Sequence, residues 1–328
     1  INMYTGLLSV YLGAACLLWV SCPNKLRSIW YYVNVWVIFI ALITGRSDNA
    51  YLSLAAAFTF IPIYAFRTRQ GIRRYVVLLA TFLTSLKVIE WIATTYADRV
   101  YQIDSLYNSL VSFSKLILLI KVLWIIAIIL YLIDFISKKA DATVSPWFSR
   151  IWIGLVVIGF AAFLYVLYDV NIAGNADKYG SAKSFLLFND SWGTHRGVIW
   201  RLAIEDYQDF TPIHKLFGYG PDTFGLVTYY HNMDIMTNVY HQIFDSAHNE
   251  YLQFFITVGP IGLLSYLAIF VTAFIRIIKK GCQNPYVIAA MLGVLCYSAQ
   301  ATVNIGTPIT IPIMFLFLSM ALAGCREA

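Results

Sequence analysis

Long apolar runs recur along this sequence and limit its possible folds more than any other feature. A helix needs roughly 17–25 apolar residues to cross a hydrocarbon core of about 30 Å. Backbone polar groups find no water there, so each such run must satisfy its own hydrogen bonds as a helix. The 328 residues are 60% hydrophobic and only 12% charged, which leaves too little polar surface for a soluble domain. We therefore expect an all-α fold, a polytopic helical membrane bundle.

The apolar runs divide into about nine predicted spans, interrupted by one long polar loop at residues 169–250. This loop separates a six-span region at 1–168 from a three-span region at 251–328, and the three parts together form one predicted domain. We expect short helices inside the loop. The predicted spans are 4–22, 29–44, 50–66, 75–95, 114–136, 152–168, 251–278, 286–305 and 309–323.

Basic residues gather in every second connection between the predicted spans. Cytoplasmic loops of membrane proteins are enriched in Lys and Arg, so these connections predict a cytoplasmic C-terminus and an external long loop. The formal net charge of +6 thus reflects topology, and no nucleic acid is expected as a partner. The basic set is Lys25, Arg27, Arg67, Arg69, Arg73, Arg74, Lys138, Lys139, Arg150, Arg276, Lys279, Lys280 and Arg326, whereas the opposite short connections hold Arg46, Arg99, Asp48, Asp98 and Asp104.

The cysteines and the first residue carry less information. All five cysteines lie in apolar segments or in turns that we place inside the cell, so we predict neither a disulfide nor a cysteine metal site. They are Cys16, Cys22, Cys282, Cys296 and Cys325. The chain begins at Ile1 without a Met or a basic signal segment, and we expect that N-terminal sequence is missing.

The long loop holds every histidine of the chain, namely His195, His214, His231, His241 and His248. Residues 196–207 have the pattern of an amphipathic helix, with Arg196 and Trp200 on one face. A glycine-rich turn follows at 218–225. Ser246 or Asn249 is placed to cap a helix that begins near residue 250, which would put His248 close to the positive end of that helix.

Four short motifs follow one another in this region. They are Arg196-x-x-Ile199-Trp200, Phe217-Gly-Tyr-Gly-Pro-Asp-Thr-Phe224, His248-Asn-x-Tyr-Leu and Gly259-Pro-Ile-Gly262-Leu-Leu. Their order resembles the O-antigen ligase/polymerase family of bacterial membrane proteins, from about residue 44 to the C-terminus. The turn at 44–52 resembles that family's Thr-x-Ser-Arg-Gly turn but has Arg46 before Ser47. Members usually have more upstream spans, which supports the expected truncation.

The resemblance implies a glycosyltransferase-C-like fold and glycosyl transfer at the outer face of the bacterial cytoplasmic membrane, without a metal or another cofactor. The donor would be a glycan on undecaprenyl pyrophosphate. The acceptor would be a hydroxyl on another glycan, on a lipid or on a wall anchor, and membrane lipid would surround the site. The shared motifs would suit a ligase and a polysaccharide polymerase equally.

The implied chemistry assigns roles to seven residues. Guanidinium groups stabilise a pyrophosphate leaving group through two-pronged hydrogen bonds, which suits Arg196, Arg201 and Arg46, with Trp200 and Asn249 completing the substrate-binding set. Histidine has an ordinary pKa of about 6.5, so His248 fits a general base for the acceptor hydroxyl. Glu250 would orient the imidazole or act as the base itself.

Each candidate in the loop also has a structural interpretation. His248 could serve only to cap a helix at the membrane surface. Arg196 could bind lipid headgroups, and Arg201 could pair with Glu205, which lies four residues further along the same predicted helix. These alternatives stay open at the level of sequence.

Charges outside the loop are equally ambiguous. Asp48 could simply neutralise Arg46 at the turn between the second and third spans. Lys87 and Glu90 share a helix face within the fourth span, where an intramembrane charge is a candidate for function or for a structural ion pair. Lys121, in the fifth span, could face an anionic lipid carrier.

A multispan transporter or flippase of lipid or polysaccharide is the main alternative function. A transporter would be expected to place its essential polar residues near the midplane, often in broken helices or repeats, whereas here they gather in one external loop. A sugar sensor is a weaker alternative because no cytoplasmic output domain is visible in the sequence. The concentration of polar residues in the external loop therefore favours an enzyme over a transporter or a sensor.

Overall fold

The computed structural model describes residues 2–101, 103–137, 142–280 and 283–327. Over these ranges the chain is helical, and the β contact that they contain is an isolated bridge between Thr68 and Thr143. Lys138, Lys139 and Cys282, which belong to the predicted cytoplasmic turns, lie outside the described residues. The expected all-α class is confirmed for the described part of the chain.

Seven helical segments in the described ranges are long and apolar enough to cross a membrane. They are α1 (Asn2–Ser21), α2 (Lys25–Thr44), α4 (Arg69–Thr95), α6 (Leu116–Ser137), α7 (Trp147–Asn171), α13 (Gly259–Lys279), and α14 (Pro285–Gln300) with the 3₁₀ turn η3 (Ala301–Val303). Two further apolar helices, α3 (Asn49–Ala65) and α15 (Thr310–Glu327), are shorter. At about 1.5 Å per residue, α3 reaches only about 25 Å. That α3 and α15 also cross stays a prediction.

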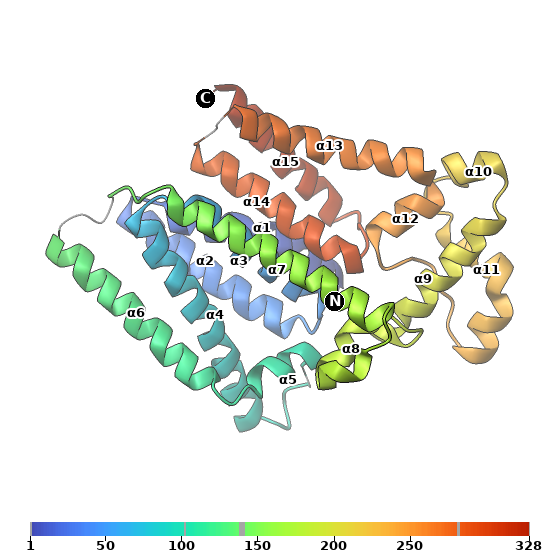
Figure 1. Cartoon of the computed structure of the whole chain (residues 1–328), viewed down its shortest axis with the longest axis horizontal. Helices are drawn as coiled ribbons and strands as arrows, with labels where there is room; N and C mark the ends of the chain where they lie inside the picture. Colours follow the sequence, from blue (N-terminus) through green and yellow to red (C-terminus); the bar gives the residue numbers. More distant parts are fainter. Residues whose placement is uncertain (1, 102, 138–141, 281–282, 328) are drawn as a thin grey trace. The chain divides into compact units, whose positions relative to one another are not determined.

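The chain divides into two compact units. The first unit comprises Ile1–Gly154, Ala273–Gln300 and Thr307–Ala328, and the second comprises Leu155–Thr272 with Ala301–Gly306. Figure 1 labels the helices of both. Since α7 and α13 each contribute one end to each unit, we describe the units separately.

Helix α1 lies in the core of the first unit, where it packs against α2, α3 and α14 (Figure 1). Two glycines allow α1 and α14 to approach closely. A Cβ added to Gly13 would lie 2.6 Å from the carbonyl oxygen of Leu292, and one added to Gly293 would lie 2.5 Å from that of Val10. Small residues at crossings of this kind let helix backbones come into van der Waals contact within a membrane.

The connections that carry most basic residues meet at one end of the first unit, which we call the basic end. Arg69 donates its backbone N–H to Ala142 at 3.0 Å, joining the start of α4 to the segment before α7. The Gln70 amide donates to the Cys22 carbonyl at 3.3 Å, after the end of α1. Arg67 Nη1 donates to Gln283 Oε1 at 2.5 Å, before α14. These connections therefore lie together, as their charge pattern predicts.

Buried arginines hold this end together. Arg74 Nη1 donates to the carbonyl oxygens of Trp19 and Cys22, each at 2.6 Å, and so caps the C-terminal end of α1. Arg73 Nη1 pairs with Asp134 at 2.5 Å and thereby links α4 to α6. Asp134 was not predicted from the sequence, because no basic residue at helical spacing within its own span indicates a partner.

The other charges expected in or near spans differ in their surroundings. Lys87 Nζ lies 2.6 Å from Glu90 Oε2, the structural ion pair that the spacing indicated. Lys121 is exposed on α6. The short helix α5 (Ser105–Val111) precedes α6 and is capped by Asp104, whose side chain accepts a hydrogen bond from Tyr107 N at 2.7 Å.

The second unit contains the long loop, which folds into short helices as expected. They are η1 (Ala176–Ala182), α8 (Lys183–Leu186), α9 (Trp192–Asp209), α10 (Pro212–Phe217), α11 (Phe224–Asp234), the π-helical turn η2 (Ile235–Val239) and α12 (Glu250–Thr257). Apolar residues of α9, α11, η2 and α12 form a common core that includes Leu202, Phe224, Met236 and Ile256. The second half of the loop is therefore a packed structure rather than an open connection.

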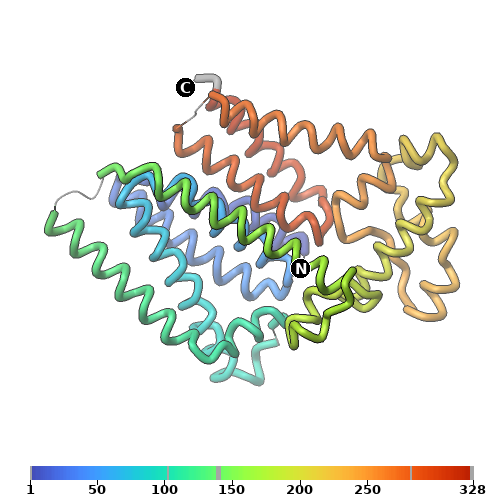
Figure 2. Tube along the Cα trace, in the orientation of Figure 1, coloured from blue at the N-terminus to red at the C-terminus, as the bar shows by residue number. Residues whose placement is uncertain are grey.

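The predicted seventh span, 251–278, is wrong as a single helix. It is broken into α12 and α13 at Val258 and Gly259, and Figure 2 follows the chain through the break. Gly259 has a φ of +70°, which an L side chain rarely adopts, and Pro260 follows it. A Cβ on Gly259 would lie 2.1 Å from the Leu216 carbonyl, and one on Gly218 would lie 2.2 Å from that of Thr257. The two glycine motifs therefore pack against each other.

Candidate functional site

A left-handed turn introduces α9. Gly193, Thr194 and His195 have φ values of +60°, +61° and +71°, so regular helical geometry begins at Arg196, the residue from which the amphipathic pattern starts. Left-handed geometry costs a non-glycine residue roughly 1–2 kcal/mol. Such strain often accompanies a functional site. Arg196 folds back over the turn and donates from Nη1 to the Gly193 carbonyl at 3.1 Å.

The segment before α12 is held by two polar contacts, one with α9 and one with α12 itself. Trp200, one turn after Arg196, donates its indole N–H to the Ala247 carbonyl at 2.8 Å. The Ala247 N–H in turn donates to Gln253 Oε1, also at 2.8 Å. These bonds fix the residue immediately before His248, so Trp200 helps to position that histidine whatever else it binds.

His248 is half-buried, and the Arg196 guanidinium lies close enough for its charge to act on the imidazole. Burial lowers the pKa of His248 below its ordinary value, the Arg196 guanidinium lowers it further, and Asp245 acts in the opposite direction. The imidazole is therefore neutral at neutral pH. Its Nδ1 is buried without a hydrogen-bond partner among the described residues, and the backbone has a φ of +45°. The two residues on which the sequence analysis placed most weight are thus brought together.

The residues after His248 form the beginning of α12. Asn249 accepts hydrogen bonds from the backbone N–H groups of Tyr251 and Leu252 at 3.0 and 3.1 Å, which confirms the predicted cap. Glu250 is 2% exposed and accepts a hydrogen bond from the Tyr266 hydroxyl in α13. Tyr266 thus orients the Glu250 carboxylate, a partner that no sequence pattern indicated.

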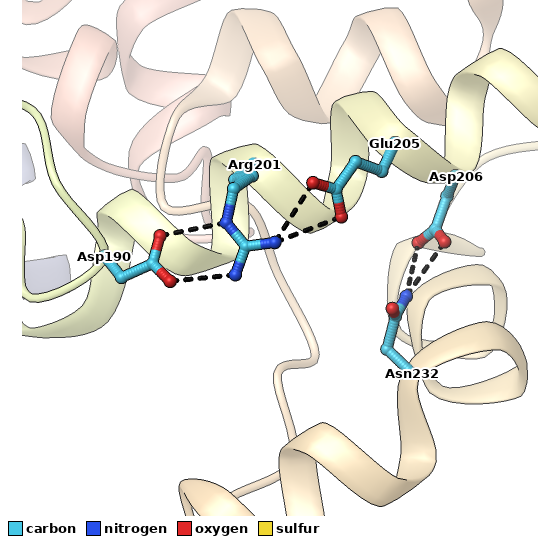
Figure 3. A network of polar contacts seen from close by, with 5 residues as sticks. All are labelled: Asp190, Arg201, Glu205, Asp206 and Asn232. Atoms are coloured by element: carbon cyan, nitrogen blue, oxygen red, sulfur yellow. Dashed lines mark hydrogen bonds and ion pairs between the residues drawn. The ribbon is translucent and has the colours of Figure 1, made fainter.

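Arg201 lies between two carboxylates, as Figure 3 shows. Nε and Nη2 donate to the two oxygens of Asp190 at 2.9 and 2.8 Å, and Nη1 donates to Glu205 at 3.0 and 3.1 Å. The predicted pair with Glu205 is confirmed. Hydrogen bonding from Arg201 holds the pKa of Asp190 below its ordinary range. A pyrophosphate would have to displace these partners, so substrate binding by Arg201 stays a prediction with less support than that by Arg196.

Further along α9, Asp206 is 4% exposed and accepts hydrogen bonds from Asn232 Nδ2 at both oxygens, at 2.8 and 2.9 Å (Figure 3). Burial raises the pKa of Asp206 in spite of these bonds. The contact joins α9 to α11. We interpret it as a structural support behind the helix that carries Arg196.

Arg46 belongs to the first unit, whereas the other six candidates belong to the second. It is exposed, has a φ of +51°, and its guanidinium lies 5.6 Å from the centre of the Tyr101 ring. Within the described chain no ion pair joins it to Asp48, whose carboxylate instead accepts from Ser105 Oγ at 3.2 Å and Leu106 N at 3.3 Å. The expected neutralisation of Arg46 by Asp48 therefore does not take the form of a direct ion pair, and Arg46 remains a candidate for anion binding.

Comparisons of the chain with protein-family models, with curated proteins and with solved structures found no match. The assignment of a function therefore depends on the residues of the site itself. In the described ranges, no three His, Cys, Asp or Glu side chains gather as a metal ion would require.

His195 was overlooked as a site residue. Its Nδ1 is buried without a hydrogen-bond partner among the described residues, and its ring meets the Tyr240 ring edge-on at 5.1 Å. Burying a polar atom without a hydrogen-bond partner costs about 1–3 kcal/mol of folding free energy. Such an atom is therefore a candidate for contact with a ligand. The signal in the sequence was its position directly before Arg196 and two residues after Gly193. Neither feature distinguishes it from a loop histidine until the left-handed turn is known.

Proposed function

We propose that this protein is a membrane glycosyltransferase of the O-antigen ligase/polymerase type. It would transfer a glycan from an undecaprenyl-pyrophosphate donor to an acceptor hydroxyl at the outer face of a bacterial cytoplasmic membrane. The observation that carries the proposal is the half-buried His248, whose Nδ1 has no hydrogen-bond partner among the described residues and whose imidazole lies within reach of the Arg196 charge in the same compact unit. The long apolar helices, which are compatible with a multi-pass membrane protein, supply the setting in which a lipid-linked donor is available.

The pair suits a displacement at the anomeric carbon. The acceptor hydroxyl would give its proton to the neutral imidazole of His248 as its oxygen bonds to the anomeric carbon. The bond between that carbon and the pyrophosphate oxygen would break at the same time, leaving its electron pair on the lipid pyrophosphate. Arg196 would stabilise the charge on this leaving group. Tyr266 holds the Glu250 carboxylate, so Glu250 fits a supporting role beside this base.

Two features of the local backbone support this assignment. The left-handed turn at 193–195 and the left-handed residue His248 place strained backbone on both sides of the pair. The Nδ1 atoms of His195 and His248 have no hydrogen-bond partner in the described part of the chain, so each could bond to a ligand. A site that served only to cap α12 would need neither, because Asn249 performs that function.

The test is transfer by the full chain in membrane vesicles that contain a defined lipid-linked oligosaccharide and an acceptor. His248→Asn is the sharpest variant, because Asn tolerates left-handed backbone and the substitution removes only the imidazole. We expect His248→Asn and Arg196→Gln to reduce product formation by at least about 100-fold, with protein abundance unchanged. His241→Asn is the matched control, because His241 is also left-handed at φ +50° but is exposed.

Product analysis distinguishes this activity from the alternative of a flippase. A transferase creates a new glycosidic bond and releases undecaprenyl pyrophosphate, whereas a flippase moves the donor across the membrane without changing it. Full transfer by both His248→Asn and Arg196→Gln would refute the site. Movement of an intact donor without any new bond, in the unsubstituted protein, would refute the enzyme.

A further inference from the structure

Two adjoining pockets occupy the basic end of the first unit. The larger, with a volume of about 440 Å³, is bordered by α1, α3, α13 and α14 and is lined largely by apolar side chains such as Ile63, Ile277 and Met291. The smaller, about 290 Å³, includes hydroxyl and amide groups from Ser21, Thr68, Gln70 and Thr143. All of their lining residues belong to the first unit. Neither pocket takes part in the proposed transfer reaction.

The pockets meet at three shared residues, Tyr64, Arg67 and Gln283. The Arg67 guanidinium lies 5.5 Å from the centre of the Tyr64 ring and donates to Gln283 at 2.5 Å. Both partners are neutral, and in the described part of the chain no carboxylate forms an ion pair with Arg67. A guanidinium has five N–H donors, so Arg67 retains the charge and the donors needed for an anion.

We propose that this double pocket binds one anionic phospholipid of the surrounding leaflet, with an acyl chain in the apolar pocket and the phosphate at Arg67. Charge complementarity selects the headgroup, because the Arg67 guanidinium at the pocket junction lies among basic connections and forms no ion pair with the described carboxylates. The apolar pocket has the size of a small-molecule site, for which about 300–1,000 Å³ is usual. Its rim residues Phe60 and Ile278 are 38% and 68% exposed, so a chain can enter from the side of the unit.

The arrangement also predicts an effect on packing. The Arg67 contact spans the turn between α3 and α4 and the segment before α14. A phosphate bound there would bridge these segments, and an acyl chain would fill the space between α3 and α14. Bound lipid should therefore stabilise the first unit, since a ligand that binds only the folded state shifts its unfolding equilibrium.

The test uses the full chain in phosphatidylcholine nanodiscs that contain a photoactivatable phosphatidylglycerol with a diazirine on one acyl chain. We expect cross-links to Ile63 or Met291, and an about fivefold lower yield in Arg67→Gln, consistent with the loss of one basic group near an anionic lipid. Arg27→Gln is the matched control, because Arg27 is exposed at the same end but lines neither pocket. Met291→Trp should block the chain and lower the yield while leaving Arg67 intact.

Three outcomes would contradict the proposal. An equal yield with photoactivatable phosphatidylcholine would show that charge does not matter. An equal loss in Arg27→Gln would show general attraction to an anionic surface rather than a site. Displacement of the lipid by inorganic phosphate alone would indicate a simple phosphate site without a role for the apolar pocket. Melting temperatures of all variants identify any loss of folding, and a variant that no longer unfolds cooperatively would be replaced by Arg67→Lys, for which a partial loss is expected.

Discussion

At the scale of single residues, the electrostatic surroundings of His248 determine how its activity should depend on pH. Burial and the neighbouring Arg196 both lower its pKa, and Asp245 raises it. A lowered pKa keeps the imidazole unprotonated and able to accept a proton over the whole neutral range. The cost is a weaker base, because basicity falls with the pKa.

We predict that transfer stays constant above pH 6.5, the ordinary histidine value, and decreases only as the pH falls through the lowered pKa. Asp245→Asn removes an attractive charge, so its decrease should occur at a lower pH than in the unsubstituted protein. Arg196→Gln removes a repulsive charge, so its residual activity should decrease at a higher pH. The measurement is the pH dependence of kcat/KM for each variant.

The assignment of His248 as the base requires the pH profiles of Asp245→Asn and Arg196→Gln to shift in opposite directions. If both profiles coincide with that of the unsubstituted protein, His248 is not the group that titrates. Arg196→Lys retains the positive charge, so its profile should stay in place even though its rate falls.

At the scale of elements, the break between α12 and α13 sets the position of the site. It allows α12 to pack into the core of the second unit while α13 continues as an apolar helix. Gly259 makes the break possible, since its φ of +70° and its contact with Leu216 leave no room for a side chain. The resemblance motifs that contain glycine are therefore explained by backbone packing rather than by catalysis.

Replacing Gly259 by Ala should destabilise the protein by at least about 1–2 kcal/mol, the cost of left-handed backbone, with a further cost from the clash at Leu216. Gly154→Ala is the matched control: a Cβ there meets nothing within 4 Å, and Ala is favoured over Gly inside a helix by about 0.5–1 kcal/mol. Thermal unfolding in detergent measures both. An unchanged melting temperature in Gly259→Ala would show that the break is not built as described.

Elements and site differ in how far the sequence predicts them. The nine apolar runs are helical over most of their described length, the seventh with a break, because a long apolar run that crosses lipid has few other ways to satisfy its backbone hydrogen bonds. The break at Val258 went unnoticed because apolar residues continue through it. The ion pair of Arg201 with Glu205 follows from their spacing of four residues along a helix. The ion pair of Arg201 with Asp190 depends on how the chain turns before α9, which no periodicity in the sequence predicts. The left-handed turn in which the Nδ1 atom of His195 is buried likewise depends on tertiary contacts.

At the scale of the whole molecule, orientation in the membrane is the property that links the site to its substrate. The basic connections of the first unit lie together at one end, and positive-inside enrichment would place that end in the cytoplasm. The proposed reaction then requires the loop of the second unit to be external. Orientation can be tested without any assay of activity.

We predict that a membrane-impermeant maleimide labels Cys at position 177 in intact cells but labels Cys at position 145 only after the cells are opened. Asp177 has a side chain that is 94% exposed in the second unit, and Ser145 is exposed at the basic end of the first unit. Each replacement is made in a cysteine-free background. Labelling at 145 and protection at 177 would reverse the orientation and remove the lipid-linked donor from the external loop.

The glycine crossing of α1 and α14 has a consequence for the order in which the protein is made. Gly13 and Gly293 leave no space for a side chain between the two backbones. Translation nevertheless completes α1 long before α14, because most of the second unit, Leu155–Thr272, lies between them in the sequence. The glycine face of α1 therefore stays without its α14 partner until α14 has been synthesised. We expect this waiting period, rather than the packing of any single helix, to be the stage of biogenesis at which an insertion chaperone or a competing helix has most influence.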